Sequence, residues 1–133
     1  MLPPVPSMKR EPAVLVVDDD PEISRLLGRS LSHRGFRADT ANSPEEALEK
    51  AATTTYDAAV LDLVMPGRDG IALASALREK MPGLPVAILT GYTHSPLLSA
   101  AQRAGVSVFK KPTPIQDLVD FLNAEIPHRL RDE

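Results

Sequence analysis

Cysteine is absent from this chain of 133 residues, which excludes disulfides, thiolate metal sites and cysteine nucleophiles. Aromatic residues make up only 4% of the chain and the formal net charge is −3, so direct binding to nucleic acid is not expected. The apolar runs stay well below the roughly 20 residues that span a bilayer. The N-terminus, interrupted by prolines, lacks the basic flank and apolar core of a signal peptide. These absences predict a cytoplasmic protein without a membrane partner.

What is present fits one globular domain, because 43% of the residues are hydrophobic and 25% are charged. Four of the 13 prolines lie within the first twelve positions, where they indicate a disordered, proline-rich leader over residues 1–11. The predicted domain covers residues 12–126 and leaves 127–133 as a C-terminal tail.

Short β-rich runs alternate with helical patterns along this domain. The predicted strands are Val14–Val17, Phe36–Thr40, Ala58–Leu61, Val86–Leu89 and Val106–Phe109. The predicted helices lie over about 21–34, behind an Asp20-Pro21 cap, behind the Ser43-Pro44 cap, and around Ile71, Ala74 and Leu77. Two more are predicted from a Ser95-Pro96 cap to Gly105 as the C-cap, and over about 114–126. Their apolar stripes, including Ile23, Leu26, Leu27 and Leu31, are assigned to the core. This alternation predicts an α/β fold, a three-layer, doubly wound, five-stranded parallel sheet.

Polar residues follow four of the predicted strands. Asp18-Asp19-Asp20 ends the first, Asp62 the third, Thr90 the fourth and Lys110-Lys111-Pro112 the fifth. Ligands of doubly wound sheets bind beyond these carboxyl ends. Crowded carboxylates need a cation, and Mg²⁺ suits oxygen ligands, while a lysine and a hydroxyl beside it suit a phosphoryl group. Asp62, after a central apolar strand, is the candidate nucleophile for an aspartyl-phosphate.

Taken in order and at these intervals, the motifs resemble the receiver (CheY-like) domain of two-component response regulators. They are residues 14–20 (VLVVDDD), residues 61–70 (LDLVMPGRDG), Leu89-Thr90-Gly91 and Lys111-Pro112. The resemblance covers about residues 12–126. It implies a flavodoxin-like sheet of strand order 2-1-3-4-5 and a phosphorelay role, in which a histidine kinase or histidine phosphotransfer protein donates a phosphoryl group to Asp62.

The resemblance also implies a role for each site residue. Mg²⁺ would be held by Asp19 directly, by Asp18 through a water, by Asp62 and by the backbone carbonyl of Val64. Thr90 and Lys111 would contact the phosphoryl group, and the Lys111–Pro112 peptide bond is expected to be cis. A protein of this kind is a phosphoacceptor, with self-phosphorylation and slow self-dephosphorylation, and not an enzyme.

Some positions depart from the family pattern. The aromatic switch residue usually stands three positions before the lysine, where this chain has Val108; Phe109 is the other candidate. Val64 and Tyr92 lie two residues after Asp62 and Thr90, along the path of the hydrolytic water in the family. An apolar and a bulky residue there imply slow loss of the phosphoryl group.

Two other functions fit part of the pattern. A phosphatase of the haloacid-dehalogenase type would carry its nucleophile on the first strand, in a motif ending in threonine or valine, where this chain has Glu22. A docking module that keeps the receiver fold without phosphorylation remains the alternative. Because no DNA-binding or catalytic segment follows residue 126, output is expected through protein–protein contacts of the surface formed by residues 90–112.

Overall fold

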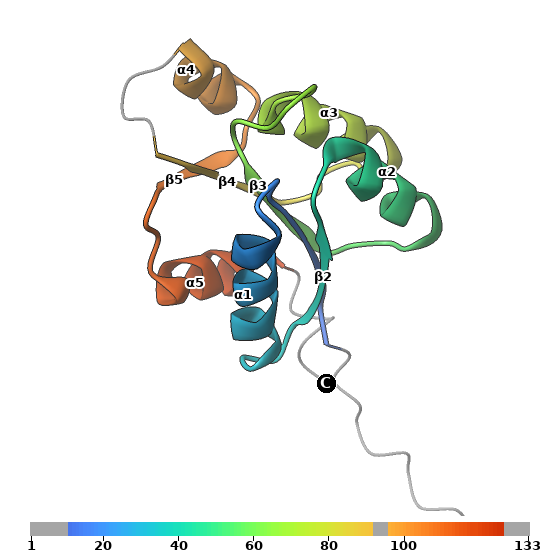
Figure 1. Ribbon diagram of the computed structural model, residues 1–133, viewed down its shortest axis with the longest axis vertical. Coiled ribbons are helices and arrows are strands. Elements are labelled where there is room, and N and C mark those ends of the chain that lie inside the picture. The colour runs from blue at the N-terminus through green and yellow to red at the C-terminus, as the bar shows by residue number, and fades with distance from the viewer. Residues whose placement is uncertain (1–10, 92–95, 127–133) are drawn as a thin grey trace, which may run out of the picture.

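The computed structural model describes residues 11–91 and 96–126, which alternate strand and helix (Figure 1). The elements are β1 Ala13–Val17, α1 Pro21–Ser32, β2 Arg37–Ala41, α2 Pro44–Thr53, β3 Ala58–Asp62, α3 Gly70–Lys80, β4 Val86–Thr90, α4 Pro96–Arg103, β5 Ser107–Lys110 and α5 Ile115–Glu125. Every strand pair is parallel and the order is β2-β1-β3-β4-β5. The predicted fold and strand order are confirmed. Within the described ranges, none of the helices is both long and apolar enough to cross a bilayer.

Two helical layers cover the sheet: α1 and α5 lie on one face, and α2, α3 and α4 on the other (Figure 1). Successive side chains of a strand point to opposite faces, so Val14 and Val16 pack toward α1 and α5, while Leu15 and Val17 pack toward the other layer. All five residues of β1 are buried. This double burial explains why the predicted strands read as continuous apolar runs.

Three helices begin at side chains that accept a backbone N–H of the first turn. Asp20 accepts from Glu22, Ser43 from Glu46 and Asp69 from Ala72, at 2.8–3.0 Å. The predicted Asp20 and Ser43 caps are thus confirmed, and Asp69 joins them as the cap of α3. The expected Ser95 cap lies outside the described residues.

The orientation of α1 differs from the expectation that its leucine stripe is core. Leu31 is buried, but Ile23 and Leu26 are 37% and 57% exposed. The line facing the sheet instead runs through Ser24, Gly28 and Leu31, all buried. A Cβ on Gly28 would come within 3.0 Å of Thr40 Cγ2, so the helix lies close to β2 because this line carries small residues.

Arg78 of α3 joins three segments through its guanidinium. Its Nε donates to the carbonyl of Leu84 at 3.0 Å, and Nη1 and Nη2 donate to the carbonyls of Ala104 and Gly105 at 2.7 and 3.1 Å. Those two carbonyls follow the end of α4. Gly105, the predicted C-cap of this helix, has the positive φ, +71°, that such a cap commonly adopts. The guanidinium therefore fixes the C-terminal end of α4 to α3 and to the loop before β4.

Arg78→Ala is expected to lower the free energy of unfolding by about 2 kcal/mol, because several carbonyls lose a charged donor. Arg78→Lys should recover little of this, since an ammonium cannot reproduce the planar fork. Urea denaturation measures both, with the exposed Arg103→Ala as a matched control that should stay within about 0.5 kcal/mol of wild type. Full recovery by lysine would show that charge alone is responsible.

Candidate functional site

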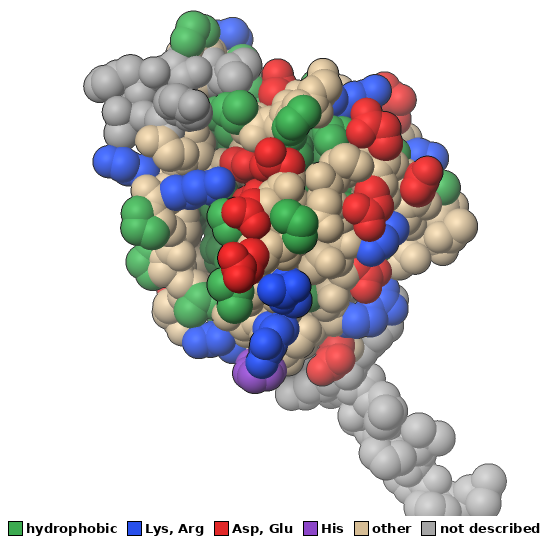
Figure 2. All heavy atoms as spheres, in the orientation of Figure 1, with side chains coloured by type: hydrophobic (Ala, Val, Ile, Leu, Met, Phe, Trp, Pro, Cys, Tyr) green, Lys and Arg blue, Asp and Glu red, His purple; other side chains and the backbone are tan. Residues whose placement is uncertain are grey.

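The carboxyl ends of four strands bring the predicted site residues to one edge of the sheet. Asp18 follows β1, Asp62 ends β3, Thr90 ends β4 and Lys111 follows β5. These strands are neighbours in the order β1-β3-β4-β5. In Figure 2, acidic side chains gather where β1 leads into α1, and Lys or Arg side chains border them.

Lys111 lies between two carboxylates. Its Nζ is 3.0 Å from Asp62 Oδ1 and 3.6 Å from Asp18 Oδ2. Burial acts to lower the pKa of Lys111, but the hydrogen bond and charge of Asp62, together with the charge of Asp18, outweigh it and raise that pKa above 10.5. Lys111 is thus an ammonium at neutral pH.

The backbone around Lys111 is fixed to β4. The Lys111 N–H donates to the Thr90 carbonyl at 2.7 Å, and the Lys111–Pro112 peptide bond is cis, as expected. Thr90 itself is only 2% exposed. The hydroxyl-bearing residue and the ammonium-bearing residue are therefore held on adjacent strand ends.

Asp18 is a buried carboxylate, 2% exposed. Its Oδ1 accepts from the Asp20 N–H at 2.9 Å, whereas Oδ2 is buried without a hydrogen-bond partner among the described residues and faces Lys111. Burial raises the pKa of Asp18 above 3.8, and the charges of Asp62 and Asp19 raise it further, against the opposing Asp20 hydrogen bond and Lys111. A buried carboxylate oxygen without a donor is suited to bind a cation.

The acidic residues fit a magnesium ion. Asp18, Asp19 and Asp62 each offer an oxygen, and these atoms lie within 4.8 Å of one another. Mg²⁺ prefers such oxygen ligands and keeps several waters, and the exposure of Asp19 leaves room for them. Val64, the fourth predicted contributor, lies in the loop beyond β3 with its side chain 47% exposed.

Gly70 holds the end of β3 in place. Its N–H donates to the Leu63 carbonyl at 2.8 Å, and a Cβ on Gly70 would lie 2.4 Å from the Asp62 carbonyl oxygen and 3.1 Å from Ile88 Cδ1. Glycines favour tight turns in this loop, and Gly67, at φ +90°, adopts the left-handed conformation that such a turn requires. Gly70 serves a different purpose, since it lets α3 start directly against the strand that carries Asp62.

The two candidates for the aromatic switch lie on opposite faces of β5. Val108 pairs with Ile88 and packs in the core toward α2–α4. Phe109 packs in the other core, where its ring meets Phe121 edge-on at a centroid distance of 5.6 Å. By strand alternation, Thr90 shares the face of Ile88 and Val108. Of the two candidates, the one that shares this face with Thr90 is therefore the aliphatic Val108, while the residue paired with Thr90 itself is Lys110.

Some further residues have structural roles, and one predicted residue lies outside the described ranges. The Asp57 carboxylate accepts from the Ala13 N–H at 2.8 Å, and so connects the start of β3 to the start of β1. Tyr92, expected near the path of the hydrolytic water, lies outside the described residues. The sequence analysis did not single out Asn42, whose side chain donates to the Asp18 carbonyl and to Ser24 Oγ, or Ser24 itself. The available signal in the sequence was a polar Ser24 among the apolar positions of α1.

Comparison with known proteins identifies related chains. A model of the response regulator receiver domain family matches residues 14–123. The chain is 37% identical over 118 residues to the DNA-binding transcriptional regulator NtrC of Escherichia coli K12, and 37% identical over 119 residues to the transcriptional regulatory protein PrrA of Mycobacterium leprae. These alignments cover 86% and 89% of this chain but 25% and 51% of the relatives. The chain thus spans a quarter to a half of their length.

Solved structures agree with these relatives. The Francisella response regulator 1452 receiver domain has a TM-score of 0.77 and 31% identity, over 86% of this chain and 95% of that one. Response regulator protein TrrA of Thermotoga maritima, solved in complex with Mg²⁺–BeF, has a TM-score of 0.76 and 32% identity, over 86% of this chain and 99% of that one.

Proposed function

The chain belongs to the response regulator receiver domain family, and from this premise we propose that Asp62 accepts a phosphoryl group from a histidine of a partner kinase or phosphotransfer protein. The observation that carries the proposal is the contact of Lys111 Nζ with Asp62 Oδ1 at 3.0 Å, beside the oxygens of Asp18 and Asp19. An ammonium next to several carboxylates suits a site that receives a phosphoryl dianion.

In the transfer, an Asp62 carboxylate oxygen attacks phosphorus while the bond from phosphorus to the histidine nitrogen breaks, and the imidazole leaves with that electron pair. Lys111 pairs with the phosphoryl oxygens, and the Thr90 hydroxyl donates to one of them. Mg²⁺, held by Asp18, Asp19, Asp62 and the Val64 carbonyl, would offset the charge on the phosphoryl oxygens. The raised pKa of Lys111 keeps its charge available for this role.

An apolar groove beside Lys111 supports docking of the phosphodonor. The groove has a volume of about 450 Å³ and is lined by Ile23, Leu27, Leu89, Lys111, Pro112 and Thr113. Ile23, exposed on α1, forms part of this groove. Because Lys111 both lines this groove and contacts Asp62, a partner seated there could bring its phosphohistidine to the carboxylate.

The output is proposed to be a changed protein–protein contact of the surface assigned to residues 90–112, of which 92–95 lie outside the described residues, without direct binding to nucleic acid. The protein acts as a phosphoacceptor and not as a turnover enzyme. Val64 presents an exposed isopropyl group after Asp62, which cannot hydrogen-bond and so cannot orient an attacking water. Slow self-dephosphorylation is therefore proposed.

Incubation with Mg²⁺ and acetyl phosphate, followed by intact-mass measurement, tests the proposal. Attack of Asp62 on phosphorus, with acetate leaving, should add one phosphoryl group. The gain should be absent in Asp62→Asn and with EDTA, and on removal of the donor it should decay slowly.

A folded protein that gains no phosphoryl mass with Mg²⁺ present would contradict the proposal and favour the docking module that works without phosphorylation. The aliphatic Val108, on the same face of the sheet as Thr90, would then fit a receiver fold that signals without a switch. Phosphorylation that persists in Asp62→Asn would place the acceptor on another residue.

A further inference from the structure

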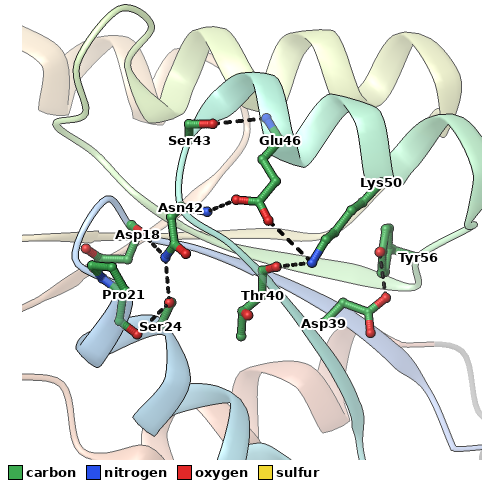
Figure 3. A network of polar contacts seen from close by, with 10 residues as sticks. All are labelled: Asp18, Pro21, Ser24, Asp39, Thr40, Asn42, Ser43, Glu46, Lys50 and Tyr56. Carbon is green, nitrogen blue, oxygen red and sulfur yellow. Dashed lines mark hydrogen bonds and ion pairs between the residues drawn. The ribbon is translucent and has the colours of Figure 1, made fainter.

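A polar network on the far side of the acidic loop ties the loop to β2 and α2 (Figure 3). At its centre, the Asn42 carboxamide donates to the Asp18 carbonyl at 2.9 Å and to Ser24 Oγ at 2.8 Å. Ser24 Oγ donates in turn to the Pro21 carbonyl at 3.1 Å. Since a carbonyl can only accept, the direction of each hydrogen bond is fixed, and both hydrogens of the carboxamide are used.

We propose that Asn42, acting with Ser24, is a positioning residue that holds the Asp18–Asp20 loop in its magnesium-binding arrangement before the ion arrives. This inference rests on the proposed function, because the loop carries two of the proposed ligands. Asn42 does not contact the ion in this proposal. It acts through the backbone of Asp18 and the first turn of α1.

Both peptide groups of Asp18 are bound to the end of β2. The Asp18 N–H donates to the Ala41 carbonyl at 3.1 Å, and the Asp18 carbonyl accepts from the Asn42 side chain. Through Ser24, the same carboxamide reaches Pro21, the first residue of α1. The Asn42 side chain is thus hydrogen-bonded to the start of the Asp18–Asp20 loop directly and, through Ser24, to the residue that follows its end.

The loop needs such support because it concentrates negative charge. Three consecutive aspartates lie here, and two of their carboxylates are close to Asp62. Like charges at this spacing repel, so without restraint the backbone would open and separate the ligand oxygens. Ser24, 1% exposed, provides a restraint that water does not reach.

Asn42 is itself held by α2. Its N–H donates to Glu46 Oε1 at 2.8 Å, and Lys50 Nζ lies 3.6 Å from Glu46 Oε2 while also donating to the Thr40 carbonyl. The support therefore extends from the second turn of α2 through β2 to the acidic loop. Residues that orient the ligands of a metal commonly change its affinity by about 10–100-fold.

Titration calorimetry with Mg²⁺ on the full chain tests the inference. Asn42→Ala and Ser24→Ala should each raise the Kd for Mg²⁺ by about tenfold, and the double variant should be little worse than either single variant, because both act in one network. If Asn42→Ala fails to fold, Ser24→Ala still tests the inference, because alanine favours a helix and is no larger than serine. Gln116→Ala is the matched control, because its amide bonds to Asp120 within α5.

A second readout follows the loop without metal. The Asp20 N–H, which bonds to Asp18 Oδ1, should exchange with solvent faster in both variants and at the wild-type rate in Gln116→Ala. Mg²⁺ affinities within twofold of wild type in folded Asn42→Ala and Ser24→Ala would overturn the inference while leaving phosphorylation of Asp62 standing. Failure of the wild-type chain to bind Mg²⁺ would overturn the proposed function as well.

Discussion

Gly70→Ala is expected to destabilise the protein by about 3 kcal/mol, near the upper end for overpacking a core, and to impair phosphorylation of Asp62. The new methyl group would lie 2.4 Å from the Asp62 carbonyl oxygen. That oxygen belongs to β3, a buried strand that pairs with β1 on one side and with β4 on the other. The backbone of β3 therefore cannot move away from the methyl group without loss of hydrogen bonds. Urea denaturation and the acetyl phosphate reaction measure the two effects.

Gly91→Ala is the matched control for stability. No described residue lies within 4 Å of a Cβ built at Gly91, and its φ is not positive. The change should therefore alter stability by no more than about 0.5–1 kcal/mol. If Gly70→Ala were as stable as wild type, α3 would not press against β3 as described. If it were destabilised but phosphorylated at the wild-type rate, the contact would serve folding alone.

Asp18→Asn should move stability and metal binding in opposite directions. The ionised carboxylate is buried, its Oδ2 has no hydrogen-bond partner in the described part of the chain, and it lies near the charges of Asp62 and Asp19. Removing its charge should therefore stabilise the metal-free protein by about 1 kcal/mol, within the range of improved charge arrangements. The same change removes a proposed ligand, so Mg²⁺ should no longer stabilise the variant. Thermal unfolding with EDTA and with Mg²⁺ measures both.

The gain in stability should depend on pH in a defined direction. The pKa of Asp18 is raised above 3.8 in the folded state, so the folded protein binds this proton more tightly than the unfolded chain. From pH 3.8 up through the raised pKa, the contribution of Asp18 to the free energy of unfolding therefore falls. The advantage of Asp18→Asn in EDTA should be absent below pH 3.8 and complete above the folded-state pKa.

Asp20→Asn provides the control for this substitution in the same loop. Asp20 is exposed, and asparagine caps a helix as well as aspartate does. Its metal-free stability should stay near that of wild type. A stabilisation equal to that of Asp18→Asn would trace the effect to the net charge of the loop and not to burial of one carboxylate.

The placement of the site could be predicted from the sequence because it depends on order alone. Polar residues at the carboxyl ends of parallel strands must lie at the same edge of the sheet. Lys111 lies there within ion-pair distance of both Asp18 and Asp62. Element boundaries also fell within one or two residues of those observed, since caps such as Asp20 and Ser43 mark them locally.

The remaining features depend on how elements pack. The apolar stripe of α1 predicted buried Ile23 and Leu26, but periodicity cannot tell a core face from an exposed apolar one, and the small Ser24 and Gly28 decided the contact. Alternation places Val108 and Phe109 on opposite faces, but only the pairing of β5 with β4 shows which one shares the face of Thr90. The hydrogen bonds of Asn42 join segments 18 and 24 positions away in sequence.

The strand order also determines how copies of this chain can meet. Its two outer strands, β2 and β5, carry the exposed charged residues Arg37 and Lys110. A strand from another molecule that extended the sheet at either border would have to desolvate a cation, which discourages edge-to-edge aggregation. We therefore expect association between copies, or with another protein, to use helix surfaces and loops, with the sheet as an internal scaffold.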